Sequence, residues 1–447
     1  MPASAVISVL ARSLLAGEPA VGDVHARAVQ TLGRSWRWLG PLARRYVERF
    51  AGGTHPRHRD VVRFLADDPG FRNALRKHRR EISIAEWLAE PQRMQPVAAA
   101  KGWDLPVIAT VGDLADWLCL SVGELEWFAD LKELGNKLRR PKLQHYHYRI
   151  LPKRSGGVRL IESPKPWLKQ LQRDILSDIL DRIPVHPAVH GFVKGRSIAS
   201  FAAPHTGKRT VLRVDLQDFF PAFPAARVQA LFRTLGYPET VADRLGGICT
   251  NAVSREVWRV RPPEIGPAEW QDARALYARP HLPQGAPTSP ALANLTAYGL
   301  DCRLSGLAKS AGAVYTRYAD DLAFSGDEEF SRVAGRFSTH AAAIALEEGF
   351  SVNFRKTRIL RQGIRQQLAG VVVNQKVSLR RRDLELLEAI LTNCVRSGPD
   401  SQNRAALPNF RAHLEGRVGF VEMVNREKGH GLRALFDAIR WEGSVQD

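Results

Sequence analysis

Two adjacent acids, Asp320 and Asp321, are the residues whose types and spacing point most directly to chemistry. They follow Tyr318-Ala319, and apolar and β-branched residues lie on both sides. This pattern predicts a strand, a tight turn and a second strand, with the acids at the turn. Two carboxylates held at a hairpin tip repel each other unless a cation lies between them. The pair therefore predicts a divalent-metal site, for which an ordinary acidic turn is the alternative.

A third acid, Asp215, ends the apolar run Arg209–Leu216, which predicts a buried strand. A carboxylate at the end of such a strand costs free energy unless it is paired or bound to metal. Asp218 is the competing candidate, but it lies beyond the predicted strand, where an exposed or helix-capping role is expected. Asp215 with the Asp320-Asp321 pair predicts a two-metal site for phosphoryl transfer.

The elements that must position these acids mix strands and helices without a strict alternation, which predicts an α+β fold. Strands are expected at His145–Ile150, Val158–Ile161 and Arg209–Leu216. Helical periodicity predicts helices at His25–Leu39, Arg57–Phe64, Asp113–Leu118, Val122–Phe128, Pro166–Ile183, Ala225–Leu235, Ala291–Leu307, Asp383–Cys394, Phe410–Val424 and Gly431–Trp441.

The net charge of the chain indicates which kind of molecule it binds. A formal net charge of +19 and a pI near 10.2 point to a polyanion, with nucleic acid as the default. A generically basic proteome is the alternative. The cluster Arg76–Arg80 is consistent with either an RNA contact or a solvated helix face.

Cysteine use and hydropathy indicate the compartment. None of the 4 cysteines forms a CxxC pair, so neither a zinc site nor a disulfide framework is expected. A reduced, cytoplasmic setting fits this usage. Met1–Leu15 lacks the basic start of a secretory signal, and no apolar stretch is long enough to cross a bilayer.

Six blocks of the sequence, taken in order, resemble those of bacterial retron-type reverse transcriptases. A lone YADD is a modest signal, but six blocks in this order are a strong one, and the match spans about Leu114 to Leu435. The blocks are Ile150–Arg159 (fingers hairpin), His190–Ile198 (HGF-x-x-GRSI), Asp215–Phe220 (motif A), Leu282–Pro290 (motif B), Tyr318–Asp321 (motif C), and Gly349–Asn353 with Lys356-Thr357 (motif D).

Two further blocks depart from the family pattern. Phe201–His205 stands where the family usually has Asn-Ala-x-x-His, and it keeps the Ala and the His but not the Asn. Leu368–Gly370 stands where the family usually has Val-Thr-Gly. Both blocks are associated with the retron's own structured RNA. The departures therefore bear on which RNA is the partner rather than on polymerisation.

The resemblance implies a right-hand polymerase with a helical N-terminal extension (residues 1–104), fingers and palm (105–378) and a helical thumb (379–447). It implies an RNA-directed DNA polymerase that copies a partner non-coding RNA into single-stranded DNA in anti-phage defence. The implied partners are a structured RNA as template and primer, its DNA product, dNTPs, and an effector protein for which the N-terminal region is the candidate surface. No membrane partner is expected.

Two other functions stay open. One is a different defence-associated bacterial reverse transcriptase with protein-primed or untemplated DNA synthesis. The other is an RNA-binding scaffold whose polymerase site is a relic, against which the intact acids argue. A group II intron maturase is disfavoured, because no downstream endonuclease or maturase-like region is seen.

The resemblance also implies a cofactor and its ligands. Two Mg²⁺ ions, for which Mn²⁺ could substitute, would be held by Asp215, Asp320 and Asp321, with the main-chain carbonyl of Leu216 completing the site. Hard oxygen ligands suit magnesium.

The resemblance also implies roles for residues other than these three acids. Phe220 would be the steric gate that rejects a 2′-hydroxyl, and Lys356 would protonate the leaving pyrophosphate or contact a phosphate. Without the resemblance, Phe220 is interpreted as a core residue. The implied nucleotide-binding residues are Lys153, Arg159, Phe220, Gln284, Gly285 and Lys356, and the implied nucleic-acid-binding residues are Arg196, Tyr318, Arg380, Arg381 and Arg417.

Overall fold

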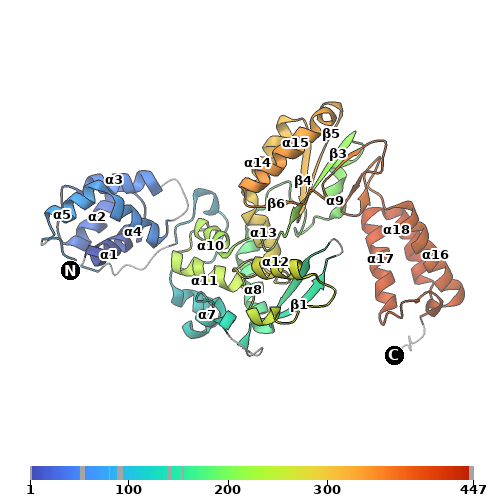
Figure 1. Cartoon of the computed structure of the whole chain (residues 1–447), viewed down its shortest axis with the longest axis horizontal. Coiled ribbons are helices and arrows are strands. Elements are labelled where there is room, and N and C mark those ends of the chain that lie inside the picture. The colour runs from blue at the N-terminus through green and yellow to red at the C-terminus, as the bar shows by residue number, and fades with distance from the viewer. Residues whose placement is uncertain are drawn as a thin grey trace. The chain divides into compact units, whose positions relative to one another are not determined.

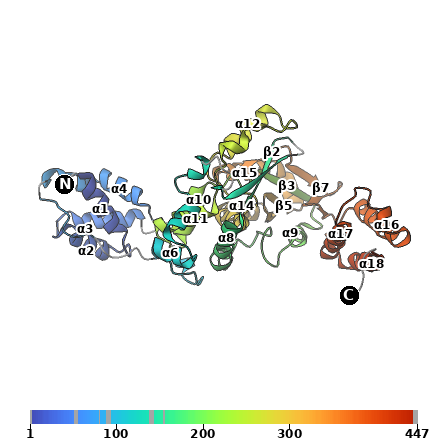
Figure 2. The same ribbon diagram turned by 90° about the horizontal axis from the view of Figure 1, so that it is seen from below.

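The computed structural model describes residues 3–50, 56–79, 81–87, 94–137, 143–153 and 156–441. It forms two compact units, one of residues 1–184 and 220–296, the other of residues 185–219 and 297–447. Figures 1 and 2 show the elements of both. Arg80 of the predicted basic cluster, and Arg154 and Ser155 of the predicted hairpin turn, lie outside the described residues.

The first unit is mostly helical. Its N-terminal helices α1 to α5 enclose a core of their own, which includes Leu10, Leu39 and Phe71. The helices and strands of this unit are α1 (Ala3–Leu15), α2 (Val21–Leu32), α3 (Leu39–Phe50), α4 (His58–Asp67), α5 (Pro69–Lys77), η1 (Ala98–Ala100), α6 (Val111–Trp117), α7 (Val122–Ala129), η2 (Leu134–Lys137), β1 (Tyr146–Pro152), β2 (Val158–Pro164), α8 (Pro166–Asp178), η4 (Leu180–Arg182), α10 (Ala225–Thr234), α11 (Glu239–Cys249), η6 (Arg255–Trp258), α12 (Pro267–Leu276) and α13 (Ser289–Thr296).

The one sheet described in the first unit is the antiparallel hairpin β1–β2, in which Leu151 pairs with Arg159. Inward residues of β2 pack with three aromatic side chains, Trp258, Trp270 and Tyr277. This packing anchors the hairpin to the body of the unit through one of its faces.

The second unit is built on a sheet of order β4–β5–β3–β6, with β7 also paired to β3. Strand β3 is nearly all buried, as its run of β-branched and apolar residues predicts. Helices α14 and α15 pack against the sheet (Figure 1). The elements are α9 (Ile198–Ala202), η5 (Ala203–His205), β3 (Thr210–Gln217), α14 (Tyr298–Ser310), β4 (Val314–Tyr318), β5 (Asp321–Gly326), α15 (Glu328–Glu347), β6 (Ser351–Val352), β7 (Arg358–Arg361), β8 (Gln367–Leu368) and β9 (Val371–Val372).

Three helices close the described chain: α16 (Arg381–Ser397), α17 (Phe410–Val424) and α18 (Arg426–Asp437), with η7 (Pro399–Ser401) after α16. Their apolar faces share a core that includes Leu391, Val418 and Phe436. Helices α17 and α18 approach closely where Gly429 lies against the backbone of Glu422.

The mixture of helices and strands that the sequence predicts is confirmed, but several helix boundaries are wrong. The helix predicted at His25–Leu39 ends at Leu32, because Gly33 turns left-handed (φ 71°) and its N–H bonds to the carbonyl of Gln30. The helix predicted at Ala291–Leu307 is two helices, α13 and α14. The helix predicted at Pro166–Ile183 ends at Asp178, and a short 3₁₀ turn follows.

The last predicted helix, Gly431–Trp441, starts earlier, at Arg426, and also ends earlier, at Asp437. The side chain of Asn425 accepts a hydrogen bond from the N–H of Lys428 and caps the new start. Within the described residues, no helix has both the length and the apolar character needed to cross a bilayer.

The close approach of α17 and α18 predicts the effect of adding one methyl group. In Gly429→Ala, the new Cβ would lie 2.5 Å from Glu422 Cα, so we expect overpacking to weaken this helix pair by about 2 kcal/mol. Gly431→Ala, on the same helix with open space around it, should stabilise by up to about 1 kcal/mol. Hydrogen exchange of the α17 and α18 amides in the full chain measures both. Equal protection in the two variants would contradict the packing.

Candidate active site

Three carboxylates converge at one end of the sheet in the second unit. Asp215 on β3 pairs directly with Asp321, the first residue of β5. Side chains of directly opposed residues in an antiparallel pair lie on the same face. Asp320 occupies the turn between β4 and β5, and its carbonyl accepts a hydrogen bond of 2.9 Å from the N–H of Leu216. The turn begins at Ala319, whose φ of 54° is left-handed.

Two cationic side chains neutralise part of this cluster. Lys356 Nζ lies 3.1 Å from both carboxylate oxygens of Asp215, which is almost completely buried. Arg213 donates from Nε (2.9 Å) and Nη2 (2.6 Å) to Asp321 Oδ1. Among the described residues, Asp320 has no ion pair of its own.

The unpaired position of Asp320 shows in its acidity. Burial, and then repulsion from Asp321, raise the pKa of Asp320 to about 6. Burial also raises the pKa of Asp321, although Arg213 opposes this shift. The raised pKa values indicate that Lys356 and Arg213 only partly offset the repulsion among the three carboxylates.

The oxygen atoms of this cluster are of the kind that a hard divalent cation requires. Carboxylate and carbonyl oxygens are the ligands that Mg²⁺ prefers, and Asp215, Asp320 and Asp321 supply three carboxylates. No three Asp, Glu, His or Cys side chains of the described residues form a metal-binding group in this arrangement, in which Lys356 and Arg213 hold two of the acids. The chemistry of the residues fits a divalent metal, and metal binding by Asp215 requires that Lys356 give way.

A buried ion pair fixes the turn that carries Asp320. Arg317, fully buried on β4, donates to both carboxylate oxygens of Asp301 on α14 (2.8 and 2.7 Å). Its Nη1 reaches the carbonyl of Ala319 (3.2 Å), inside the turn. The hydroxyl of Tyr315 donates a further bond to Asp301 (2.8 Å). Removing one member of such a network would leave an uncompensated charge in the core.

The segment around His190-Gly191 supports the same turn from the other side. The main chain of Arg317 bonds to this segment twice, to the carbonyl of Ala188 and from the N–H of His190, both at 2.8 Å. Gly191 lies so close to the turn that an added Cβ would be 2.6 Å from the N atom of Ala319. Glycine is required here because the two backbones nearly touch.

The blocks Phe201–His205 and Leu368–Gly370 share one core on the sheet. Phe201 and Ala202 of the first block are buried with Leu368 of the second. His205 is buried between the hydroxyls of Ser325 (2.6 Å) and Thr316 (2.7 Å), and burial lowers its pKa to about 3. It is therefore neutral at physiological pH and serves as a hydrogen-bonding residue of the core.

Comparison with known proteins identifies the family. A family model described as reverse transcriptase (RNA-dependent DNA polymerase) matches residues 151–394. The retron Mx65 reverse transcriptase of Myxococcus xanthus is 42% identical over 336 residues, which are 74% of this chain and 72% of that protein. This chain belongs to the retron-type reverse transcriptases. The predicted activity, RNA-directed DNA polymerase, is thereby confirmed.

Other similarities are more distant. The retron Ec86 reverse transcriptase of Escherichia coli is 34% identical over 290 residues, which are 64% of this chain and 78% of that protein. A solved foamy viral protease–reverse transcriptase in complex with RNA/DNA hybrid is 14% identical, with a TM-score of 0.35, over 68% of this chain and 32% of that one. The latter likeness is too weak to carry an argument about the site.

The predicted site residues of the reverse transcriptase divide between its two units. Lys153, Arg159, Phe220, Gln284 and Gly285 belong to the first unit, whereas the acids, Leu216 and Lys356 belong to the second. Lys153 and Arg159 flank the β1–β2 turn, and Phe220, the last residue of motif A, is half-buried. Gly285 has φ 136° and lies against the carbonyl of Glu162, where an added Cβ would be only 2.8 Å away.

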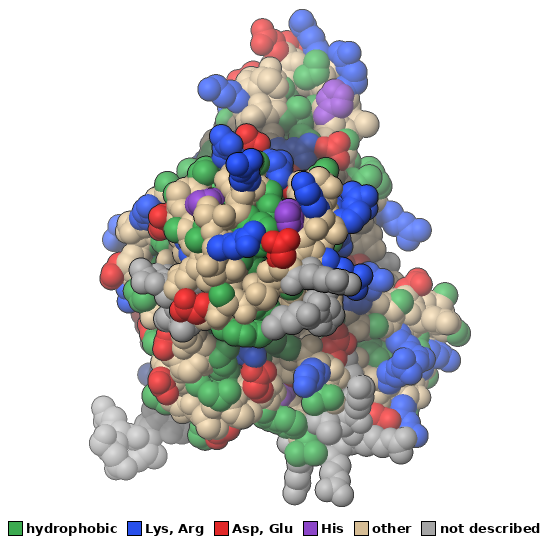
Figure 3. Space-filling model, turned by 90° about the vertical axis from the view of Figure 1, so that its left-hand side faces the viewer, with side chains coloured by type: hydrophobic (Ala, Val, Ile, Leu, Met, Phe, Trp, Pro, Cys, Tyr) green, Lys and Arg blue, Asp and Glu red, His purple; other side chains and the backbone are tan. Residues whose placement is uncertain are grey.

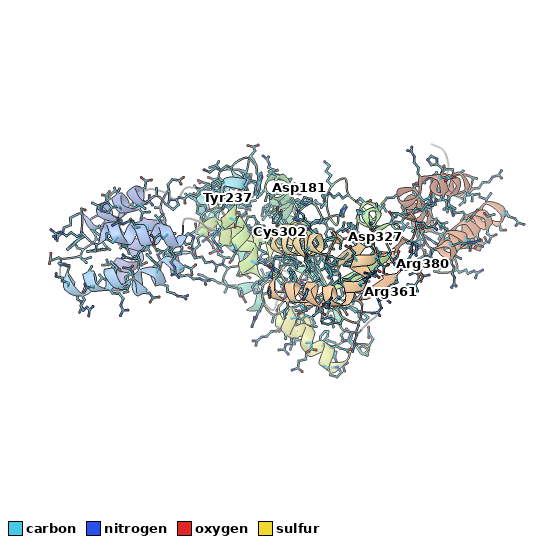
Figure 4. The ribbon with its side chains drawn as sticks, turned by 90° about the horizontal axis from the view of Figure 1, so that it is seen from above. Asp181, Tyr237, Cys302, Asp327, Arg361 and Arg380 are labelled. Carbon is cyan, nitrogen blue, oxygen red and sulfur yellow. The ribbon has the colours of Figure 1, made fainter. Side chains whose placement is uncertain are left out.

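The predicted nucleic-acid contacts of the reverse transcriptase all lie in the second unit. Arg196 donates from Nη1 to the carbonyls of Pro187 and Val189, so it stabilises the HGF segment. Tyr318 packs against Phe192 and Phe201. Arg380, labelled in Figure 4, bonds to Gln367 and precedes α16; Arg381 begins that helix and pairs with Glu385, and Arg417 lies on α17.

Sequence reasoning missed Arg213, Asp301 and Arg317, the charged residues that surround the acids. Each had a signal: Arg213 precedes Asp215 by two residues in a strand, which places both on one face, and Arg317 is a charged residue inside an otherwise apolar strand. A buried charge requires a partner. The partner of Arg317, Asp301, lies 16 residues away on a helix that sequence patterns did not connect with it.

Gly191→Ala should impair the reverse transcriptase through the motif C turn. The new Cβ would push on the backbone of Ala319 and move Asp320, so we expect kcat to fall by about tenfold or more, since small misplacements at a reacting centre are costly. Single-nucleotide primer extension measures kcat and the KM for dNTP. Gly306→Ala, on α14 with open space around it, is the matched control. An unchanged kcat in Gly191→Ala would show that the close contact does not position the turn.

Asp320→Asn should stabilise the metal-free reverse transcriptase at pH 7.5 but not at pH 4. The carboxyl ionises near 3.8 in an unfolded chain and near 6 in the fold, so stability falls as pH rises between these values and stays lower above them. A shift of about two pKa units corresponds to at most about 3 kcal/mol, which Asn would recover. Melting temperatures in EDTA at both pH values measure the effect. A variant less stable than the wild type at pH 7.5 would contradict the assigned repulsion.

Proposed function

We propose that this reverse transcriptase copies a partner non-coding RNA into single-stranded DNA by two-metal nucleotidyl transfer, in a retron that acts in anti-phage defence. The observation that carries the chemistry is the convergence of Asp215, Asp320 and Asp321 at one end of the sheet, with Lys356 and Arg213 beside them. Reverse transcriptases in general use divalent metal ions, and the donor set here suits Mg²⁺, with Mn²⁺ as a substitute.

In this mechanism Asp215, Asp320, Asp321 and the main-chain carbonyl of Leu216 would hold the metal, which would supply activation of the primer 3′-hydroxyl and neutralisation of the triphosphate charge. The half-exposed ammonium of Lys356, released from Asp215, would contact a phosphate or protonate the leaving pyrophosphate. Arg213 would keep Asp321 oriented, so that Asp321 acts more through geometry than through direct ligation.

The remaining roles follow from the family resemblance. Lys153 and Arg159 on the β1–β2 hairpin bind the triphosphate, Gln284 and Gly285 lie beside the nascent base pair, and Phe220 rejects a 2′-hydroxyl. Helices α16 to α18 form the thumb, where Arg380, Arg381 and Arg417 contact the backbone of the heteroduplex, as does Arg196 in the HGF segment. Such contacts recognise shape and phosphate rather than sequence.

The class of partner proposed here is supported by the relatives. Retron reverse transcriptases make DNA from dNTPs with a non-coding RNA, and the net charge of +19 suits a polyanionic partner. An effector protein is proposed to bind the N-terminal region. The changed blocks Phe201–His205 and Leu368–Gly370 favour an RNA different from those of the relatives that carry the usual sequences.

Asp215→Asn and Asp320→Asn should each lower DNA synthesis on a primed RNA template by about a thousand-fold, since losing a metal ligand removes several kcal/mol of transition-state stabilisation. Asp218→Asn, which alters the competing acid beyond β3, is the matched control and should retain most activity. Extension by purified protein with Mg²⁺ or Mn²⁺ measures all three. Full synthesis by Asp215→Asn, with loss in Asp218→Asn, would mean that the metal site is wrongly assigned.

The retron role is tested by expressing the protein with its native flanking DNA and extracting nucleic acid. RNase-sensitive, branched single-stranded DNA is the expected product. Its absence from cells, with purified protein still active on primed RNA, would favour a protein-primed or untemplated programme. Its absence together with inactive purified protein would favour the relic scaffold.

A further inference from the structure

A cavity of about 510 Å³ lies among the N-terminal helices, far along the chain from the acids. Arg49 at the end of α3, Arg57 before α4 and Arg63 on α4 line it, and α10 contributes Arg233. Four guanidinium groups around one cavity repel one another unless anions lie between them. The volume is that of a small-molecule site.

Arg233 shows the shortage of anions most clearly. Its side chain is 6% exposed, and its Nη1 has no hydrogen-bond partner among the described residues. The carboxylate of Asp243 is 3.7 Å away, beyond hydrogen-bond distance. Burial, and then repulsion from Arg57, lower the pKa of Arg233. A buried cation with an unsatisfied donor that lines a cavity is expected to have its partner in a ligand.

Acidic side chains balance part of this charge. Asp68 is occupied, since Arg45 donates to both of its oxygens (2.7 and 2.9 Å) and the N–H of Phe71 bonds to it as well. Asp60 and Asp67 also line the cavity, and Asp243 and Glu239 add negative charge near Arg233. Even with these acids present, Arg233 Nη1 has no hydrogen-bond partner among the described residues.

Aromatic side chains lie beside the arginines. Phe50 and Phe64 line the cavity and are half-buried, and their rings meet edge to face with centroids 5.7 Å apart. A site that joins guanidinium groups and aromatic surface matches a nucleotide, whose phosphate pairs with arginine and whose base has an apolar face. Inorganic anions alone would not need the aromatic wall.

The surrounding surface favours a nucleic acid as the source of that nucleotide. Residues 1–80 contain 15 Lys and Arg against 6 Asp and Glu. Lys and Arg side chains are spread over the face that Figure 3 shows. Such an excess attracts the phosphate backbone and raises its local concentration. Tyr237, labelled in Figure 4, marks the chain just after α10, the helix that carries Arg233.

We propose that this cavity binds the phosphate of a single unpaired nucleotide of RNA, with its base against Phe50 and Phe64. The N-terminal helices would then be an RNA-binding module separate from the polymerase site. The inference rests on the proposed partnership with RNA and adds to it a specific anchoring position.

The test compares two charge-matched double variants of the full-length protein. Arg57→Gln with Arg63→Gln removes two cavity arginines, whereas Arg59→Gln with Arg72→Gln removes two exposed arginines of α4 and α5 that do not line the cavity. The binding of a fluorescent single-stranded 12-nucleotide RNA is measured by anisotropy in EDTA at several salt concentrations. We expect the cavity pair to weaken binding by about tenfold and to lower the salt slope by about 0.7, the value for one lost phosphate contact.

The control pair should weaken binding by less than about twofold, as lost long-range attraction alone predicts. Equal weakening by both pairs, or by neither, would overturn the proposal. AMP is tested as a competitor, and competition that disappears in the cavity variant would support the phosphate site.

Extension of a primed RNA template is measured in parallel. Wild-type protein that extends the template while both pairs bind RNA alike rejects the cavity and leaves the polymerase assignment intact. Wild-type protein that neither binds RNA nor extends the template rejects the proposed function itself.

Discussion

Repulsion among three carboxylates is the constraint on which the rest of the second unit depends. The register of β3 with β5 places Asp215 opposite Asp321, and the turn adds Asp320 beside them. Such a cluster is stable only with positive charge close by. Lys356 and Arg213 provide this positive charge. Arg213 lies on β3, and Lys356 lies between β6 and β7, which both pair with β3. The fold thus places the three acids together and offsets part of their charge with its own cations.

The turn that carries Asp320 is held from both sides. The Arg317–Asp301 pair reaches it from within the core, and Gly191 meets it from the adjoining segment. The position of this turn is therefore fixed by buried packing and hydrogen bonds.

The sequence was sufficient to predict the strand that ends in Asp215, the hairpin that carries Asp320, and the α+β character, because each depends on local periodicity. It did not predict that Lys356 would pair with Asp215, which required knowing that two segments 141 residues apart lie together. Helix ends were missed where a single residue decides them, as at Gly33. Arg317 escaped notice because its partner lies on another element.

The shared core of Phe201–His205 and Leu368–Gly370 has a consequence for how this protein can change. Phe201 and Leu368 fill one volume, and Ala369-Gly370 forms a tight turn with both φ angles positive (42° and 92°). A change of side-chain size at one of these two positions would leave a mismatch unless the other changed with it. The two blocks are therefore expected to tolerate joint replacement better than replacement of either block alone.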